Sequence, residues 1–292
     1  MPARKVLIVG ATGSVGSSLT RQLLAIDNPL LIRGSTRNVA KATFPPQVEA
    51  VQGDLEDPTS YSSLFNGIDC VFTYAGEKTP WPELLAAAKA GGVRRIVLLS
   101  SMTAEFDPDG NIGTLHRQAE EAIEAAGFEY TFIRPRNFAS NTRSFWAPTL
   151  AKTGKLWITY PNAHTAPVSE DDMAAVALVG ITTDRIVNQA VPLCGPVSLS
   201  QQEQFEAINR LREREGKAAF ELVVLPPDEW RKQMQAWRGD DFDPVFVDQL
   251  LKWWKETDGT PEKIQSSERI TGQPSQSYDD WLELNKDAFL KN

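Results

Sequence analysis

Short apolar runs alternate with amphipathic stretches along the first half of the chain. A short apolar run is typical of a strand that is buried on both faces of a parallel sheet. The runs predict strands at 5–9, 48–52, 69–73, 95–100 and 130–134. Apolar residues at three- and four-residue steps predict helices at 15–26, 61–65, 81–90 and 115–126. Strands that alternate with helices in this way indicate an α/β protein with a doubly wound parallel sheet.

Three glycines lie between the first predicted strand and the first predicted helix. They have the spacing Gly10-x-x-Gly13-x-x-Gly16. Without a Cβ, such a turn lets backbone N–H groups approach a phosphate, and the helix N-terminus adds a partial positive charge. Because the motif follows a strand and opens a helix, it predicts a Rossmann dinucleotide site rather than an unrelated glycine-rich turn. The expected pyrophosphate contacts are Gly10, Thr12, Gly13, Ser14, Val15 and Gly16.

The predicted end of the second strand carries no acidic residue. In an NAD site, an Asp or Glu about 20 residues after the glycines binds the adenosine ribose. This chain has Thr36, Arg37 and Asn38 there, and Lys41 follows closely. A guanidinium can bind a phosphate through a bidentate, charge-assisted fork, so Arg37 favours NADP over NAD. The alternative is that Arg37 is an ordinary solvated arginine.

The chain of 292 residues is long enough for one large domain with a smaller lobe. We predict an NADP-binding domain at 1–150 and a smaller, mostly helical substrate-binding lobe at 151–292, partly interwoven with the first. Five of the eight tryptophans lie in the last third, at Trp230, Trp237, Trp253, Trp254 and Trp281. We expect most of these rings to pack in the core and one or two to line an apolar pocket.

Charge and residue usage exclude several classes of partner. With a net charge of −8 and no basic run, we expect no binding to nucleic acid or to an anionic membrane. The longest apolar run, 173–181, is too short to span a bilayer, so we expect neither a signal peptide nor a transmembrane helix, and a cytoplasmic location. Cys70 and Cys194 lie in apolar surroundings that favour core packing over a disulfide. The cysteines and the histidines His116 and His164 lack metal-ligand spacing, so no metal is expected.

Several motifs together resemble the NmrA-like branch of the short-chain dehydrogenase/reductase superfamily, which includes isoflavone-reductase-like and ergot-alkaloid-pathway reductases. Besides the glycine motif, they are 36–38, 53–55, Ser100-Ser101, 121–127 followed by 130–141, 168–176 and 270–274. The resemblance covers most of the chain. It implies an NADPH-dependent reductase of a C=O, C=N or conjugated C=C bond in an apolar cyclic metabolite. Such a protein would act as a monomer or homodimer.

The resemblance also implies which residues contact the rest of the cofactor. Asp54 and Leu55 would bracket the adenine, and a carboxylate at a strand end can indeed accept from the adenine amino group. The segment Tyr74, Ala75 and Gly76 would cover the adenosine half. Pro135, Asn137 and Phe138 would border the nicotinamide, although Phe138 could equally be a core aromatic. Ser100 and His116 complete the expected cofactor contacts.

The chain departs from the family at the proton donor. A typical member has a Ser after the fifth strand and a Tyr-x-x-x-Lys, in which the Tyr protonates the substrate oxygen. Here His116 occupies the Lys position and Ile112 the Tyr position, and no tyrosine lies between 75 and 129. With a pKa near neutrality, His116 could donate a proton, or it could hold the nicotinamide ribose. Ser101 is the other catalytic candidate, and His164 is a weaker one in a loop that faces substrate in the family.

Two other functions remain open at this point. A catalytically silent NADP-sensing regulator is compatible with the NmrA-like resemblance and with the missing tyrosine. A redox-neutral cyclase or isomerase could keep the fold and use the cofactor as a scaffold. The aromatic C-terminal third favours a small-molecule pocket, and an iminium substrate would need no donor to an oxyanion. We therefore expect a reductase.

Overall fold

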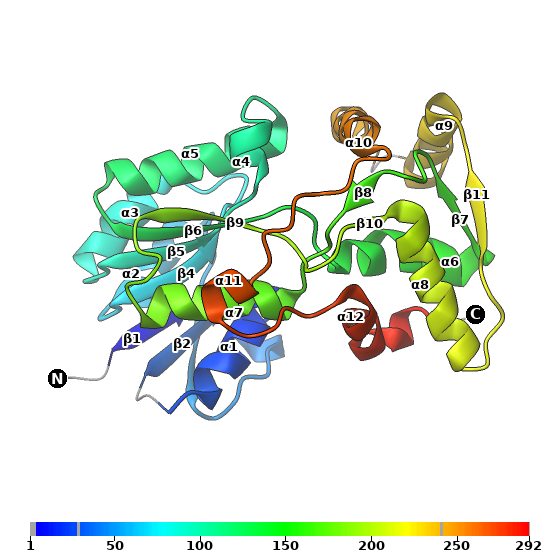
Figure 1. Ribbon diagram of the computed structural model, residues 1–292. Coiled ribbons are helices and arrows are strands. Elements are labelled where there is room, and N and C mark those ends of the chain that lie inside the picture. Colours follow the sequence, from blue (N-terminus) through cyan, green and yellow to red (C-terminus); the bar gives the residue numbers. More distant parts are fainter. Residues whose placement is uncertain (1–3, 28–29, 240–241, 292) are drawn as a thin grey trace. The chain divides into compact units, whose positions relative to one another are not determined.

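A computed structural model of the protein describes residues 4–27, 30–239 and 242–291. By compactness the chain divides into two units, which Figure 1 shows in the colours of the sequence. Unit 1 consists of Met1–Pro135, Glu170–Leu193 and Ser267–Gln273, and unit 2 consists of Arg136–Ser169, Cys194–Ser266 and Pro274–Asn292. The first break falls at Pro135, earlier than the predicted boundary after residue 150, and the chain returns twice to unit 1.

The strands of unit 1 form one seven-stranded parallel sheet, which confirms the predicted doubly wound class. The order across the sheet is β3-β2-β1-β4-β5-β6-β9 (Figure 1). The strands are β1 (Lys5–Ile8), β2 (Leu31–Thr36), β3 (Val48–Gln52), β4 (Cys70–Tyr74), β5 (Arg95–Leu99), β6 (Glu129–Pro135) and β9 (Gln189–Leu193). Val6, Leu7 and Ile8 are fully buried, which explains the continuous apolar run in this central strand. β9 comes from a returning segment, and this is why the units interleave in sequence.

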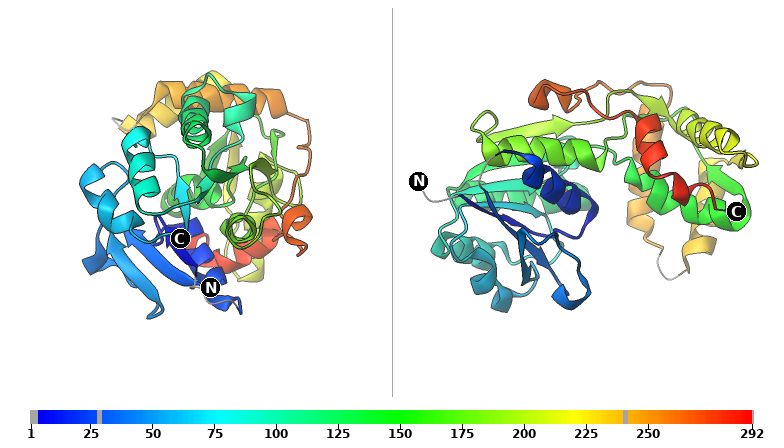
Figure 2. Two further views of the ribbon diagram at one scale, coloured as in Figure 1. Left: turned by 90° about the vertical axis from the view of Figure 1, so that its left-hand side faces the viewer. Right: turned by 90° about the horizontal axis from the view of Figure 1, so that it is seen from below.

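Helices cover both faces of this sheet. They are α1 (Ser14–Ala25), α2 (Tyr61–Phe65), α3 (Trp81–Ala90), α4 (Thr103–Phe106), α5 (Asn111–Ala125), α7 (Glu170–Thr182) and α11 (Glu268–Thr271). α1 and α7 pack side by side on one face, and α3 and α5 pack together on the other (Figures 1 and 2). α5 begins at Asn111 rather than at the predicted Leu115, because its first turn is mostly polar and hides the apolar period. The absence of a side chain at Gly113 lets this turn lie against the backbone oxygen of Asp107.

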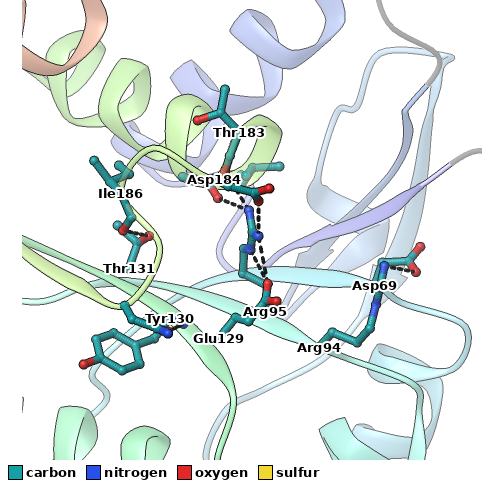
Figure 3. Close-up of polar contacts among 12 residues, drawn as sticks. Asp69, Arg94, Arg95, Glu129, Tyr130, Thr131, Thr183, Asp184 and Ile186 are labelled. Atoms are coloured by element: carbon teal, nitrogen blue, oxygen red, sulfur yellow. Dashed lines mark hydrogen bonds and ion pairs between the residues drawn. The ribbon is translucent and has the colours of Figure 1, made fainter.

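A buried arginine ties α7 to the sheet at the end where the strands begin, which we call the amino end. Arg95 opens β5 and is 4% exposed. Its guanidinium donates to the carbonyls of Gly180 and Thr183, at the C-terminus of α7, and forms ion pairs with Glu129 and Asp184 (Figure 3). The last carbonyls of a helix have no partner within the helix, so the arginine satisfies two of them.

Unit 2 is mostly helical. It contains a π-helical segment η3 (Thr142–Trp146), α6 (Ala147–Thr153), α8 (Gln201–Arg214), α9 (Pro227–Arg238), α10 (Pro244–Thr257) and α12 (Tyr278–Leu284). Two short strand pairs join β7 (Lys155–Ile158) to β11 (Glu221–Val224) and β8 (His164–Thr165) to β10 (Leu199–Ser200). Asp243 caps α10 by accepting from the backbone N–H groups of Val245 and Phe246, and Pro244 occupies the first turn of the helix.

The tryptophans of unit 2 pack largely against one another and against the core. Trp230 and Trp281 are buried, as expected for core rings. Trp230 meets Trp254 edge to face with ring centroids 5.1 Å apart, whereas Trp237 meets Trp157 at 4.7 Å and stays 40% exposed. Cys70 and Cys194 are buried and do not form a disulfide with each other, and their burial confirms their assignment as core residues. No helix in the part of the chain that the structure describes could cross a membrane.

Candidate functional site

The predicted cofactor residues of unit 1 follow the ends of parallel strands. Parallel strands end on the same side of a sheet, so the structure brings these residues to one end, which we call the carboxyl end. Backbone hydrogen bonds of 2.9–3.0 Å join the segment after β1 to both neighbouring strands here: Val9 N donates to Phe72 O of β4, and Ala11 N donates to Ser35 O of β2. The predicted residues that follow or close these strands are Gly10, Arg37, Asp54, Tyr74, Ser100 and Pro135. Ligands bind at this end of doubly wound sheets.

The glycine turn has the shape of a phosphate cradle. Gly10 has a φ of +68°, a conformation that favours glycine, and the N–H of Gly13 donates to Gly10 O at 2.9 Å. A Cβ on Gly16 would lie 2.3 Å from Gly10 O, so no side chain fits where α1 meets the turn. α1 starts at Ser14 without a side-chain cap and without an acid in its first turn. Its N-terminal N–H groups therefore suit an anion, and a dinucleotide pyrophosphate fits this cradle.

Arg37 and Tyr74 flank this turn. Arg37 is exposed directly after β2 and, among the residues that the structure describes, has no carboxylate partner. Tyr74 closes β4 with 41% exposure, and a Cβ on Gly10 would lie 3.1 Å from its Cε1. Partial burial raises the pKa of Tyr74, against the opposing effect of the Arg37 charge, so the phenol stays protonated. A cationic side chain and an aromatic face are thus both available beside the pyrophosphate turn.

The other predicted adenosine residues have local structural roles. Asp54 Oδ1 accepts from the backbone N–H of Glu56 at 3.0 Å and so stabilises the turn after β3. Leu55 is buried in the core, and its carbonyl accepts from the hydroxyl of Tyr61 at 2.5 Å. A Cβ on Gly76 would lie 2.6 Å from Thr79 Oγ1, so a side chain here would require Thr79 to move. These contacts neither require nor exclude a nucleotide, and the adenine contacts stay predictions.

Ser100 and Ser101 have different surroundings although they are neighbours. Ser100 is 2% exposed, and its hydroxyl donates to Glu120 Oε1 at 2.5 Å. Ser101 is half-buried, and its oxygen accepts from the backbone N–H of Thr103 at 3.2 Å at the start of α4. The hydroxyl proton of Ser100 is therefore already committed within the protein, and Ser101 remains the better-placed hydroxyl of the two.

Glu120 and Arg134 lie beside Ser100, and neither is among the site residues predicted from the sequence. Arg134 donates to Glu120 through Nε at 3.0 Å and Nη2 at 2.6 Å, and through Nη1 to Glu105 at 2.9 Å. An arginine inside the apolar strand run and a glutamate beside the apolar stripe of a helix could have indicated them. An isolated charge in either place would be costly to bury, so each predicts a partner.

His116 is half-buried on α5, and its Nδ1 is buried without a hydrogen-bond partner among the described residues. Burial lowers the pKa of His116 to about 4. The imidazole is therefore neutral at pH 7, unlike the near-neutral titration that the proton-donor hypothesis assumed. A neutral imidazole can still donate one N–H to a ligand oxygen. An unpaired buried polar atom costs about 1–3 kcal/mol, so a polar ligand here would relieve that cost.

Three predicted residues belong to unit 2. Asn137 donates from Nδ2 to Thr165 Oγ1 at 3.2 Å and accepts from Asn141 Nδ2 at 2.8 Å. Phe138 is half-buried, and its backbone bridges to Val168. His164 lies on β8, with its Nδ1 3.4 Å from the hydroxyl oxygen of Ser198. Their predicted roles at the nicotinamide and the substrate stay predictions.

Comparison with known proteins places this geometry in a family. The sequence profile described as NAD(P)H-binding matches residues 10–183. A relative from Streptomyces griseus subsp. griseus, named (4-alkanoyl-5-oxo-2,5-dihydrofuran-3-yl)methyl phosphate reductase, is 32% identical over 97% of this chain and 99% of its own length. NAD(P)H azoreductase from Xenophilus azovorans is 24% identical over 97% of this chain and 99% of its own length.

Solved structures share the fold along nearly the whole chain. An NADPH-dependent quinone oxidoreductase from Escherichia coli, solved with NADPH, has a TM-score of 0.78 at 20% identity. The match covers 96% of this chain and 99% of that chain. With the glycine cradle at the strand ends and the extent of the sequence matches, the chain belongs to the NAD(P)H-binding family and is an NAD(P)H-dependent reductase.

Proposed function

We propose that this protein uses NADPH to reduce a conjugated C=C bond in a small cyclic carbonyl compound. The observation that carries the proposal is the relative at 32% identity over 97% of the chain, whose name specifies an acylated dihydrofuranone. In such a ring the double bond is conjugated to carbonyl groups. The neutral imidazole of His116 supports this substrate class over a simple ketone, since a conjugated carbonyl oxygen needs a hydrogen-bond donor more than a strong acid.

The chain's own residues divide the work of binding between them. The N–H groups of the first turn of α1 hold the pyrophosphate, and the uncommitted guanidinium of Arg37 binds the 2′-phosphate that distinguishes NADPH from NADH. When bound, NADPH supplies a hydride to the double bond. His116 donates its N–H to the carbonyl oxygen that gains negative charge, and solvent supplies the proton that completes the reduction. Ser101 is the second donor within unit 1.

The test is NADPH oxidation, followed at 340 nm, against a matched panel of acceptors. The panel contains 4-acyl-dihydrofuran-5-ones with and without a phosphate, cyclic enones, saturated cyclic ketones and iminium ions. We expect turnover with the conjugated compounds and little with the saturated ketones. His116→Ala should lower kcat on the conjugated compounds by roughly 10²-fold, as the loss of one oxyanion donor does in other enzymes.

Three results would overturn this proposal in whole or in part. Tight NADPH binding without oxidation across the whole panel would favour the NADP-sensing regulator. Product formation without consumption of NADPH would favour a cyclase or isomerase. Faster turnover of ketones or iminium ions than of conjugated compounds would keep the reductase and overturn its substrate class.

A further inference from the structure

Three elements of unit 1 meet at the carboxylate of Glu120. Ser100 follows β5, Arg134 lies near the end of β6, and Glu120 lies on α5. Glu120 is 5% exposed, accepts from the Ser100 hydroxyl at 2.5 Å, and is held by Arg134 in a bidentate pair at 3.0 and 2.6 Å. The backbone joins the same two strands here, since Ser100 N donates to Ile133 O at 2.7 Å. The carboxylate thus anchors one turn of α5 to two adjacent strand ends.

Apolar side chains could hold a helix on a sheet without the desolvation cost of a buried carboxylate. A buried ion pair often contributes no more stability than apolar residues of the same volume. What the pair adds is direction, since a bidentate guanidinium and a hydroxyl fix the carboxylate in orientation as well as in distance. The position of Glu120 on α5 therefore indicates which part of the helix is held in a fixed orientation.

Glu120 lies four residues after His116, so both side chains project from the same face of α5, one turn apart. The hydrogen bonds of Glu120 go to Ser100 and Arg134, and the buried Nδ1 of His116 has no partner among the described residues. Glu120 therefore does not act as a carboxylate that orients the imidazole directly. It sets the place of the helical turn from which the imidazole projects.

We propose that Glu120 is a positioning residue of the reductase, which fixes His116 at the carboxyl end of the sheet through its bonds to Ser100 and Arg134. The proposal rests on the proposed role of His116 and deepens it. Arg134 extends the same anchor to α4 through Glu105, at 2.9 Å, so the Ser101 turn and the His116 turn share one support. Both donors proposed for the substrate oxygen then depend on the same ion pair.

The chain contains a matched control at the other end of the same two strands. Arg95 and Glu129 face each other at the starts of β5 and β6 and also form a doubly hydrogen-bonded ion pair, in which Arg95 Nε and Nη2 both donate to Glu129 Oε2, at 2.9 and 2.8 Å. Glu129→Gln removes one carboxylate partner from an arginine of this strand pair, as Glu120→Gln does, but at the amino end of the sheet. A purely structural role predicts similar effects of the two variants on activity, whereas a positioning role predicts a loss for Glu120→Gln alone.

The experiment compares wild type, Glu120→Gln, Glu120→Asp and Glu129→Gln by steady-state kinetics and by imidazole NMR. For Glu120→Gln we expect kcat to fall about 100-fold, the cost of roughly 1 Å of misplacement, with the dissociation constant of NADPH nearly unchanged. Glu120→Asp, which keeps the charge, should recover part of kcat, and Glu129→Gln should leave kcat unchanged. The chain has only two histidines, so the ¹⁵N signals of His116 are resolved and should shift in Glu120→Gln but not in Glu129→Gln.

The NMR arm separates this inference from the proposed function. If none of the acceptors supports NADPH oxidation by the wild-type protein, the proposed function fails. The His116 signals still report whether Glu120 positions the imidazole. Unchanged His116 signals and wild-type kcat in Glu120→Gln would overturn the inference while leaving the reductase intact. If Glu120→Gln does not fold, Ser100→Ala, which keeps the ion pair and removes one bond to it, should shift the same signals and lower kcat to a smaller extent. Wild-type signals and kcat in that variant would also overturn the inference.

Discussion

An arginine–glutamate ion pair lies at each end of the β5–β6 strand pair, and the two pairs have different surroundings. At the amino end, Arg95 is buried but its partners Glu129 and Asp184 have side chains that are 51% and 88% exposed (Figure 3). At the carboxyl end, the carboxylate side chain of Glu120 is 6% exposed, and the arginine is the more open partner at 17%. The first pair satisfies helix carbonyls, and the second anchors the helix that carries a candidate donor. The same chemistry therefore serves stability at one end and precise placement at the other.

The largest expected effect is at the glycine turn, which belongs to the carboxyl end alone. Gly13→Val would place side-chain atoms where the predicted pyrophosphate would lie, starting from a Cβ 3.2 Å from Gly10 O. We expect NADPH affinity to fall by about 3–6 kcal/mol, the loss of two charge-assisted hydrogen bonds at about 1.5–3 kcal/mol each. Fluorescence titration measures it on protein whose fold is verified by circular dichroism. Gly67→Ala, just before β4 at the amino end, should bind NADPH normally, and normal binding by a folded Gly13→Val would mean that the motif is only structural.

The next largest effect is expected on stability, and it compares the arginines Arg134 and Arg95 of the two ends. Arg134→Met leaves Glu120 as a buried carboxylate without a counter-charge and should lower the free energy of unfolding by about 3–5 kcal/mol. Arg95→Met leaves its carboxylates in solvent and mainly orphans two helix carbonyls, so we expect a smaller loss, of about 1–3 kcal/mol. Urea denaturation of both variants measures the difference. An equal or larger loss for Arg95→Met would mean that the burial of the carboxylate is not what distinguishes the two ends.

His116, at the carboxyl end, gives a pH dependence of stability that follows from the burial of its imidazole. Its folded-state pKa of about 4 lies below the ordinary value of 6.5, so the unfolded chain binds the proton more readily. The contribution of the neutral His116 to the free energy of unfolding is therefore complete above pH 6.5. It is lost as the pH falls from 6.5 towards 4, by up to about 3 kcal/mol. His116→Ala should flatten the stability curve in this window, as measured by urea midpoints. Parallel curves for the two proteins would mean that the pKa of His116 is not lowered. The imidazole would then titrate near neutrality and could donate its proton.

The smallest effect concerns cofactor choice. Arg37→Ala should weaken NADPH binding by about 1.5–3 kcal/mol, the cost of one charge-assisted phosphate contact, and leave NADH binding unchanged. Arg94→Ala is the matched control, because this exposed arginine at the amino end pairs with Asp69 at 3.6 Å (Figure 3). Titration of both nucleotides against both variants measures the preference. Equal affinities of the wild-type protein for NADPH and NADH would mean that Arg37 does not bind the 2′-phosphate.

Much of the nucleotide half could be read from the sequence because its signals are local. The apolar run at β1, the glycines of the next turn and the amphipathic α1 are adjacent in the chain, and each follows from the conformation of a few consecutive residues. The missing acid after β2 is equally local, so the expectation for Arg37 needed only a count along the chain. The start of α5 was missed by four residues because a polar first turn carries no apolar period.

The sequence by itself determined the parallel sheet, its glycine turn and the residues at most strand ends, since period and spacing are properties of short segments. Only the tertiary structure decided that Glu120 meets both Ser100 and Arg134, because contacts between residues 20 and 14 positions apart depend on how α5 lies on the sheet. It also decided the protonation state of His116, because a pKa is set by burial among atoms from several elements. The returning segments 170–193 and 267–273 join unit 1 for the same reason: β9 pairs with β6 across a long stretch of intervening chain, and no local pattern specifies that pairing.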